Sequence, residues 1–212
     1  MKRILIMIAA AWAFALTAMA QTPEEIINGM EAATNRAETE GLSMAMDIKI
    51  PILGTQTSTT YILGDKVKTE MTLMKTQYIM YEDETTEWEY DSSKNKITIK
   101  SFEKGTSKSS EAEENLSLFD GITQEYDVKL DKETADAWYI RCDKKKTCTE
   151  KDAPKRMDLV IAKKDYMPIS LSTTISGVKM TIRDVKLGVK EEDVTFNINA
   201  FPGAVIEDQR LK

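Results

Sequence analysis

The chain has 212 residues, of which 42% are apolar and 30% are charged, a composition typical of a folded globular protein. Histidine is absent, which excludes Ser-His-Asp triads, Cys-His dyads and imidazole zinc sites. The formal charge of −6 argues against nucleic acid as a partner, because Lys and Arg neutralise phosphates in such complexes. We therefore expect one folded domain that needs no cofactor and no metal.

The first twenty residues have the pattern of a secretory signal peptide. Lys2 and Arg3 precede an apolar run at residues 4–16, and Ala18 and Ala20 then stand before the expected cleavage point. The alternative is an uncleaved anchor, although the apolar run is shorter than the about 20 residues that span a bilayer. We expect residues 1–20 to be removed, and residues 21–212 to be a soluble, monomeric protein of the periplasm.

The two cysteines, Cys142 and Cys148, are separated by a short polar segment. An exported chain enters an oxidising compartment, so this even count predicts a disulfide between them. A redox-active pair is the alternative, but the spacing is not Cys-x-x-Cys.

A helix is predicted from Pro23 to about Glu40. Thr22 is a suitable N-cap, and Glu25 completes a capping box with it. Four apolar residues at helical spacing form one stripe: Ile26, Met30, Ala33 and Ala37. The helix is therefore expected to pack by one side.

The pattern changes to period 2 at residues 42–50, which predicts a strand. Further strands are expected at 55–63, 66–73, 76–82, 86–91 and 96–102, and then at 125–130, 137–142, 156–162, 168–175 and 178–187. The short connections favour antiparallel hairpins. Between the two groups, Ser110 and Glu113 form a second capping box that predicts a short helix with Leu116 and Phe119, although a linker between two domains is the alternative.

Eleven antiparallel strands and two amphipathic helices predict an α+β fold. We expect a strongly curved antiparallel sheet, or an unclosed eleven-strand β-barrel, with helices covering its open side. Several methionines fall on the predicted strands, and flexible Met side chains can line a cavity for an apolar ligand. The alternative is that these methionines only fill a core.

Three passages resemble the family of LolA, the periplasmic carrier of outer-membrane lipoproteins. Residues 86–100, which include Trp88 and Tyr90, resemble its "LWxYxP" hairpin, and residues 159–171 resemble a strand, turn and returning strand. Residues 194–197 and 202–210 resemble its "FTF…PPxGVxVxDxR" ending. The resemblance implies an unclosed barrel with a helical lid over an apolar cavity, which carries the acyl chains of lipoproteins from the inner to the outer membrane.

The resemblance also implies partners and a lid mechanism. The partners would be acylated lipoproteins or other lipids, an inner-membrane transporter that releases them and an outer-membrane acceptor. The family has an Arg on an early strand that fastens the lid, whereas the corresponding segment 64–69 offers Lys66 and Lys68. An ammonium group cannot reproduce the planar fork of a guanidinium. We therefore expect apolar packing, and not a polar latch, to hold the lid.

The lipid-binding residues expected from the pattern and the resemblance together are Ile26, Met30, Met44, Met46, Ile48, Met71, Met80, Trp88, Tyr90, Leu116, Phe119 and Trp138. A lipid-responsive sensor or regulator of the envelope, and a carrier of a different lipid, are alternatives, because one fold can host several functions. An enzyme is not expected. Chance predicts about one Ser-x-x-Lys pair in this chain, so the three at Ser93/Lys96, Ser101/Lys104 and Ser176/Lys179 are poor evidence for one.

Overall fold

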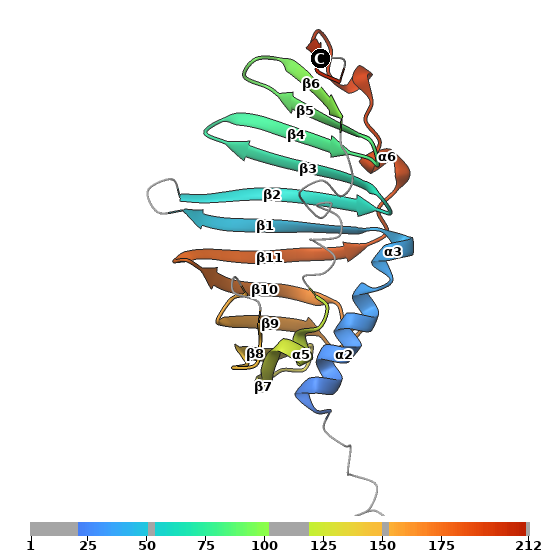
Figure 1. The fold of residues 1–212 in the computed structure, drawn as a ribbon. Helices are drawn as coiled ribbons and strands as arrows, with labels where there is room; N and C mark the ends of the chain where they lie inside the picture. Colours follow the sequence, from blue (N-terminus) through green and yellow to red (C-terminus); the bar gives the residue numbers. More distant parts are fainter. Residues whose placement is uncertain (1–20, 51–53, 102–118, 150–152, 211–212) are drawn as a thin grey trace, which may run out of the picture.

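The computed structural model describes residues 21–50, 54–101, 119–149 and 153–210 (Figure 1). Within these residues, twelve strands form one sheet in the order β12-β6-β5-β4-β3-β2-β1-β11-β10-β9-β8-β7, which does not close into a barrel. The strands are β1 (Leu42–Ile50), β2 (Gly54–Leu63), β3 (Lys66–Leu73), β4 (Thr76–Glu82), β5 (Thr86–Asp91), β6 (Lys96–Ser101), β7 (Tyr126–Glu133), β8 (Ala137–Lys144), β9 (Arg156–Ala162), β10 (Pro168–Ile175), β11 (Val178–Leu187) and β12 (Val205–Asp208).

The eleven predicted strands correspond to β1 to β11, with boundaries that differ by no more than a few residues. The predicted α+β class and the open, antiparallel sheet are confirmed. The expected number of strands was too low by one, because β12 at the C-terminus pairs with β6 in parallel. A four-residue strand has too short an alternation to be recognised from its own sequence.

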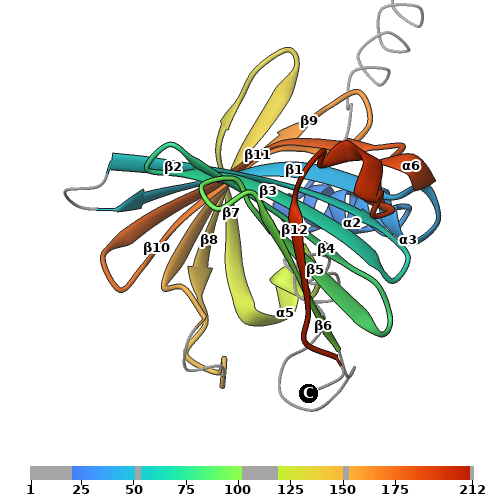
Figure 2. The same ribbon diagram turned by 90° about the horizontal axis from the view of Figure 1, so that it is seen from above.

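The sheet is strongly twisted, as the fanned strands in Figure 2 show. Register shifts interrupt the ladders between β1 and β11, between β9 and β10, and between β7 and β8. Such bulges increase the local twist and bend the strand that carries them. They help the sheet to present a curved inner face.

Helix α2 (Pro23–Thr34) begins as predicted, with Thr22 and Glu25 forming both hydrogen bonds of the capping box. The predicted helix to Glu40 is interrupted after Thr34 and resumes as α3 (Ala37–Glu40), which ends at Gly41 with φ of 71°. The short elements α5 (Ile122–Glu125), α6 (Glu191–Val194) and the 3-10 turn η1 (Ile198–Ala200) were not predicted. The helix expected to open at Ser110 lies outside the described residues.

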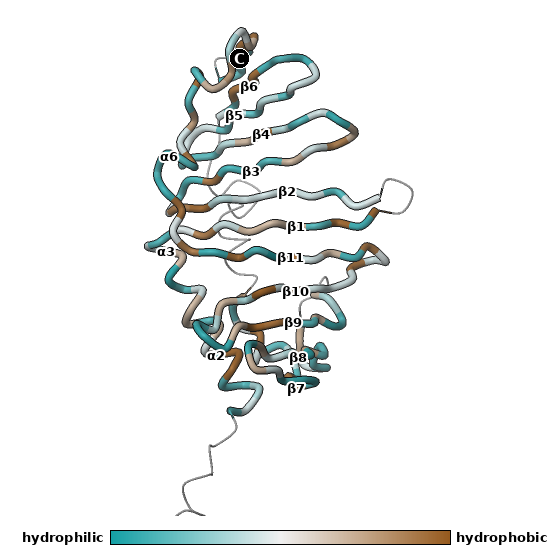
Figure 3. The backbone as a smooth tube through the Cα atoms, turned by 180° about the vertical axis from the view of Figure 1, so that it is seen from behind, coloured by the Kyte–Doolittle hydropathy of each residue, from teal (hydrophilic) through white to brown (hydrophobic). Residues whose placement is uncertain are grey.

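Helix α2 covers the half of the sheet formed by β7 to β11, and we call the face that it covers the inner face (Figure 1). Its Ile26, Ile27 and Met30 are fully buried in the main core, together with strand residues such as Leu159 and Ile182. The apolar colouring is strong along β9 in Figure 3. In the described part of the chain, no helix has the length and apolar character that crossing a membrane requires.

Candidate functional site

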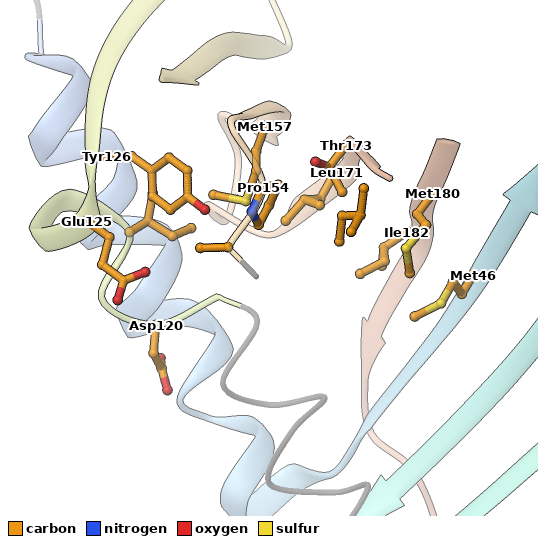
Figure 4. Close-up of a pocket in the computed structure, with 13 residues that line it drawn as sticks. Met46, Asp120, Glu125, Tyr126, Pro154, Met157, Leu171, Thr173, Met180 and Ile182 are labelled. Atoms are coloured by element: carbon orange, nitrogen blue, oxygen red, sulfur yellow. The ribbon is translucent and has the colours of Figure 1, made fainter. Parts of the chain in front are cut away.

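An apolar pocket of about 250 Å³ lies on the inner face, beside α5 (Figure 4). Its residues are Met46, Asp120, Ile122, Glu125, Tyr126, Ala153, Pro154, Met157, Leu171, Thr173, Ile175, Met180 and Ile182. Three of them are methionines, whose flexible side chains adapt to ligands of variable shape. The pocket therefore suits an apolar ligand.

Cross-strand pairing builds the floor of the pocket. Met46 of β1 lies opposite Ile182 of β11, and Ile182 lies opposite Leu171 of β10. In the neighbouring row, Met180 lies opposite Thr173. Paired residues of an antiparallel ladder project to the same face, so this register gathers apolar side chains from distant parts of the sequence.

The α5 side of the pocket is fastened to helix α2 by Glu31. The N–H of Ile122 donates to Glu31 Oε1 at 3.1 Å. Partial burial, together with the charge of Asp120, raises the pKa of Glu31 above its usual value, although the hydrogen bonds from the Ile122 and Gly121 backbone oppose this. A polar contact therefore joins α5, which lines the pocket, to helix α2.

The middle of α2 packs closely on Tyr166. A Cβ atom added to Gly29 would lie 2.4 Å from Cδ1 of the Tyr166 ring, so the helix can approach only because glycine has no side chain. Gln21 Nε2 donates to the Tyr166 hydroxyl at 2.5 Å. The same ring lies 5.2 Å from Trp138, which is in the main core. Close packing thus fixes α2 over the sheet.

Of the predicted lipid-binding residues, Met46 lines the pocket. Five others are buried in the main core, where they support α2 and the sheet: Ile26, Met30, Met44, Phe119 and Trp138. Leu116 lies outside the described residues. The structure therefore brings together only part of the expected set.

Three further predicted residues lie on the inner face beyond the pocket. Ile48 and Met80 are partly buried there, and Met71 is 45% exposed. Met80 belongs to the same cross-strand row as Met44, through Thr69 and Thr60. This row continues the inner face towards β4.

The structure does not bring Trp88 and Tyr90 to the pocket, because their side chains lie on the opposite, outer face of the sheet. Trp88 stacks on Phe196 at 5.2 Å, and Tyr90 lies 4.6 Å from Phe201. Phe196 and Phe201 come from the C-terminal segment, which forms a second, smaller core with β4, β5 and β6. These two aromatic residues therefore anchor the C-terminal segment to the sheet.

The predicted disulfide is not formed in the structure, where Cys142 and Cys148 are both free thiols. Cys142 is fully buried in the main core, and its burial and two nearby aspartates raise its pKa to about 12. Cys148 lies in the loop after β8. That loop is held instead by Lys145, whose backbone N–H donates to the Glu125 carbonyl at 2.9 Å.

Neither lysine of segment 64–69 contacts α2. Lys66 forms an ion pair with Glu191 of α6. Lys68 is on the outer face, pairs with Glu70 at 2.5 Å and lies over the rings of Tyr61 and Tyr81. Burial is the largest single effect and lowers the pKa of Lys68, but the hydrogen bond to Glu70, together with the interactions with Tyr81 and the Glu70 charge, outweighs it, so the pKa is raised. The structure thus provides no lysine latch here, while Glu31 supplies a polar contact that the sequence did not predict.

In the Ser-x-x-Lys pair at Ser93/Lys96, both side chains bind other residues. Ser93 donates to Asp91 at 2.6 Å, and Lys96 forms an ion pair with Glu207. In the described ranges, no cluster of three or more acidic, Cys or His side chains could hold a metal ion. Ser93 and Lys96 are therefore not paired with each other.

No protein family and no curated protein matches the chain by sequence. Similar solved structures include the LolA superfamily protein NE2245 from Nitrosomonas europaea, with 10% identity and a TM-score of 0.32 over 85% of this chain and 100% of that one. Lipoprotein LppX from Mycobacterium tuberculosis has 10% identity and a TM-score of 0.46 over 74% of this chain and 90% of that one.

The Pseudomonas aeruginosa MucA/MucB complex also contains a similar chain, with 9% identity and a TM-score of 0.42 over 82% of this chain and 60% of that one. LolA superfamily proteins are thus among the structural neighbours, as the sequence resemblance predicted, at low identity. Since these TM-scores lie below 0.5, the function has to be argued from the chain's own residues.

Proposed function

We propose that this protein is an exported carrier that shields the acyl chains of lipoproteins, and moves them from the inner to the outer membrane of the envelope. The observation that supports this proposal is the apolar pocket on the inner face, with Met46, Met157 and Met180 in its wall. Such a pocket offers an acyl chain the contacts that it loses on leaving a bilayer.

The size of the pocket limits what it holds without rearrangement. Its volume of about 250 Å³ is slightly below the range of about 300–1,000 Å³ that is usual for ligand pockets. A single chain, or part of one, fits this space better than several chains do. A larger cargo requires α5 or α2 to move, and breaking the contact between Glu31 and Ile122 is one cost of that movement.

That cost is useful to a carrier. Each buried methylene contributes about 0.8 kcal/mol, so a long chain held without any opposing term would not be released. Displacing the buried residues of α2 would offset part of this gain, because the helix and the ligand compete for the same inner face. The implied inner-membrane transporter and outer-membrane acceptor would load and unload the pocket.

Native mass spectrometry of the protein purified from its own envelope tests the proposal. Bound lipoprotein supports the carrier function, and bound free lipid assigns the pocket to a different lipid cargo. An empty pocket with a tightly copurifying membrane regulator would overturn the carrier function in favour of a sensor.

A pair of matched variants tests whether the pocket is the site. Met180→Glu places a carboxylate in the apolar wall, where a charge without a partner is strongly unfavourable, and should reduce lipid binding at least tenfold. Met74→Glu makes the same change at a residue that is 71% exposed, and should leave binding unchanged. Equal effects of the two variants would contradict the assignment.

A further inference from the structure

The β3–β4 turn exposes apolar side chains at one end of the sheet. The antiparallel order places the turns β1–β2, β3–β4, β5–β6 and β10–β11 at the same end, which we call the hairpin end (left in Figure 1). Figure 3 shows apolar colouring at the β3–β4 turn. Met74 is 71% exposed, which is the highest value among the large apolar residues of the described chain, and the neighbouring Leu73 is also exposed.

The backbone of this turn is unfavourable for the two residues at its tip. Met74 and Lys75 have φ of 48° and 77°. Hairpin turns with positive φ at both central residues favour Asn and Gly, because larger side chains crowd the backbone there. The β10–β11 turn has Gly177 at the corresponding second position. A turn that keeps Met and Lys at a cost in stability indicates a function for these side chains.

Lysines without acidic partners lie near the turn. On the outer face, Lys49 of β1 lies directly opposite Lys179 of β11, and both are exposed. Like charges at opposed positions of a ladder repel each other. Neither these two lysines nor Lys75 forms an ion pair with a described residue. Since only β2 separates β1 from β3, this positive charge is close to the apolar turn.

Acidic residues are absent from this part of the hairpin end. The described segments 48–50, 54–57, 71–78 and 175–180 contain neither Asp nor Glu, although the chain has 35 acidic residues among 212. The next carboxylate along β1, Asp47, is neutralised by Arg183 at 2.7 Å. Glu125 is in α5, which packs on β7 at the far edge of the sheet. The surface around the β3–β4 turn is therefore both apolar and positively charged.

This surface is adjacent to the apolar pocket. Met180 lines the pocket and pairs with Ile48, and the next rung of the same ladder is the pair of Lys49 and Lys179. Successive residues of a strand point to opposite faces, so the pocket wall is on the inner face and the lysines are on the outer face. Both nevertheless lie at the same end of the strands.

We propose that the hairpin end docks on an anionic lipid bilayer. Leu73 and Met74 enter the interface between head groups and acyl chains. The ammonium groups of Lys49, Lys75 and Lys179 contact lipid phosphates. An acidic protein partner would account for the lysines but would leave the apolar tip of the turn in water. Because the chain has a net charge of −6, its other faces are repelled by anionic lipid, and this surface sets the orientation.

Vesicle flotation, with no cargo added, tests the docking. The protein should float with vesicles of phosphatidylethanolamine and phosphatidylglycerol, and should not float with vesicles of phosphatidylcholine. Added salt should weaken binding, because it screens exposed charges. Met74→Asn combined with Lys75→Gly gives the turn its preferred residues. This variant should raise the thermal stability and lower the affinity for anionic vesicles about fivefold or more, so a loss of binding would not reflect misfolding.

Paired lysine variants locate the charge effect. Lys49→Gln combined with Lys179→Gln removes the like-charge pair without loss of stability. At about fivefold for each lysine, it should lower the affinity for anionic vesicles about 25-fold. Lys164→Gln combined with Lys190→Gln removes two exposed lysines at the opposite end of the strands and should leave the affinity unchanged.

The docking inference goes beyond the proposed function, because it does not need a ligand in the pocket. Met180→Glu separates the two: it should impair binding of a dispersed lipid, in which Met74 takes no part, and should keep the affinity for vesicles. An equal loss of vesicle affinity in Met180→Glu would show that vesicles bind through the pocket, and the docking surface would be wrong.

Three other results would overturn docking and leave the proposed function untouched. The first is equal binding to both kinds of vesicle, and the second is parent-like affinity of the turn variant. The third is no binding to either vesicle, which would leave an acidic protein as the partner of the lysines.

Discussion

Replacing Gly29 by Ala tests the close packing of α2 on the sheet. The added methyl group would lie 2.4 Å from Cδ1 and 2.7 Å from Cε1 of Tyr166, well inside normal contact. The ring cannot turn aside freely, because its hydroxyl accepts from Gln21 and its face lies beside Trp138. The substitution should therefore push α2 away from the sheet.

Two effects of opposite sign decide the magnitude. Alanine in place of glycine inside a helix stabilises it by about 1 kcal/mol. Overpacking of this kind costs about 1–3 kcal/mol, which leaves a net loss of about 0–2 kcal/mol in the free energy of unfolding. In a Tyr166→Ala background the clash is absent, and the same substitution should stabilise the protein by about 1 kcal/mol.

Denaturant unfolding of the four proteins in this cycle measures the coupling between the two positions. Asn28→Ala, at the exposed neighbouring position of α2, is the matched control and should give a small stabilisation. A stabilisation of about 1 kcal/mol by Gly29→Ala in the parent protein, with no coupling to Tyr166, would refute the close packing.

The remaining predictions concern the thiols and two carboxylates. In the native protein an alkylating reagent should modify Cys148 and should not modify the buried Cys142. Both cysteines should react after unfolding without reductant. If neither reacts in the unfolded protein, the two cysteines form a disulfide. Hydrogen bonds from Arg183 lower the pKa of Asp47, so above pH 3.8 this pair should add up to about 1 kcal/mol to the free energy of unfolding. This contribution is lost as the pH falls. In urea unfolding, Asp47→Asn should therefore destabilise the protein less at pH 3 than at pH 7. The pKa of Glu31 is raised, so ionisation of this carboxyl should lower the free energy of unfolding as the pH rises above 4.5. The stability of Glu31→Gln relative to the parent protein should therefore be greater at pH 7 than at pH 4. A difference between the two proteins that is the same at both pH values would contradict the shift.

The strands could be predicted because their signals are local. Alternation of apolar and polar residues is clear in segments such as 42–50, and glycines mark turns such as Gly64 and Gly177, where the observed φ is 57° and 83°. The signal for the start of α2 is equally local, since Thr22 and Glu25 form the capping-box hydrogen bonds within one turn. Such signals need no knowledge of the rest of the fold.

The pocket could not be predicted in the same way, because it depends on which strands are neighbours. The first strand, β1, pairs with β11 near the end of the chain, and this pairing brings Met46 beside Ile182. Alternation alone could have grouped Met180 with Ile182, but it does not show that they face Met46. The residues of β9 and β10 were missed for this reason.

The placement of Trp88 and Tyr90 shows a second limit. Alternation correctly implies that they share one face of β5, and it does not show which face is covered by α2. The C-terminal segment supplies Phe196 and Phe201 to the other face, so two apolar cores lie on opposite sides of the same sheet. Because both faces are buried in part, an apolar side chain on a strand does not identify the inner face.

Photo-crosslinking tests the central claim most directly. A lipid with a diazirine in its acyl chain would be bound to the protein, activated by light and located by peptide mass spectrometry. We predict labels in β9, β10 and β11, at or beside Met157, Leu171 and Met180. Labels confined to the exposed Met74 or to the outer aromatic residues around Trp88, with none in these three strands, would contradict the assignment of the pocket.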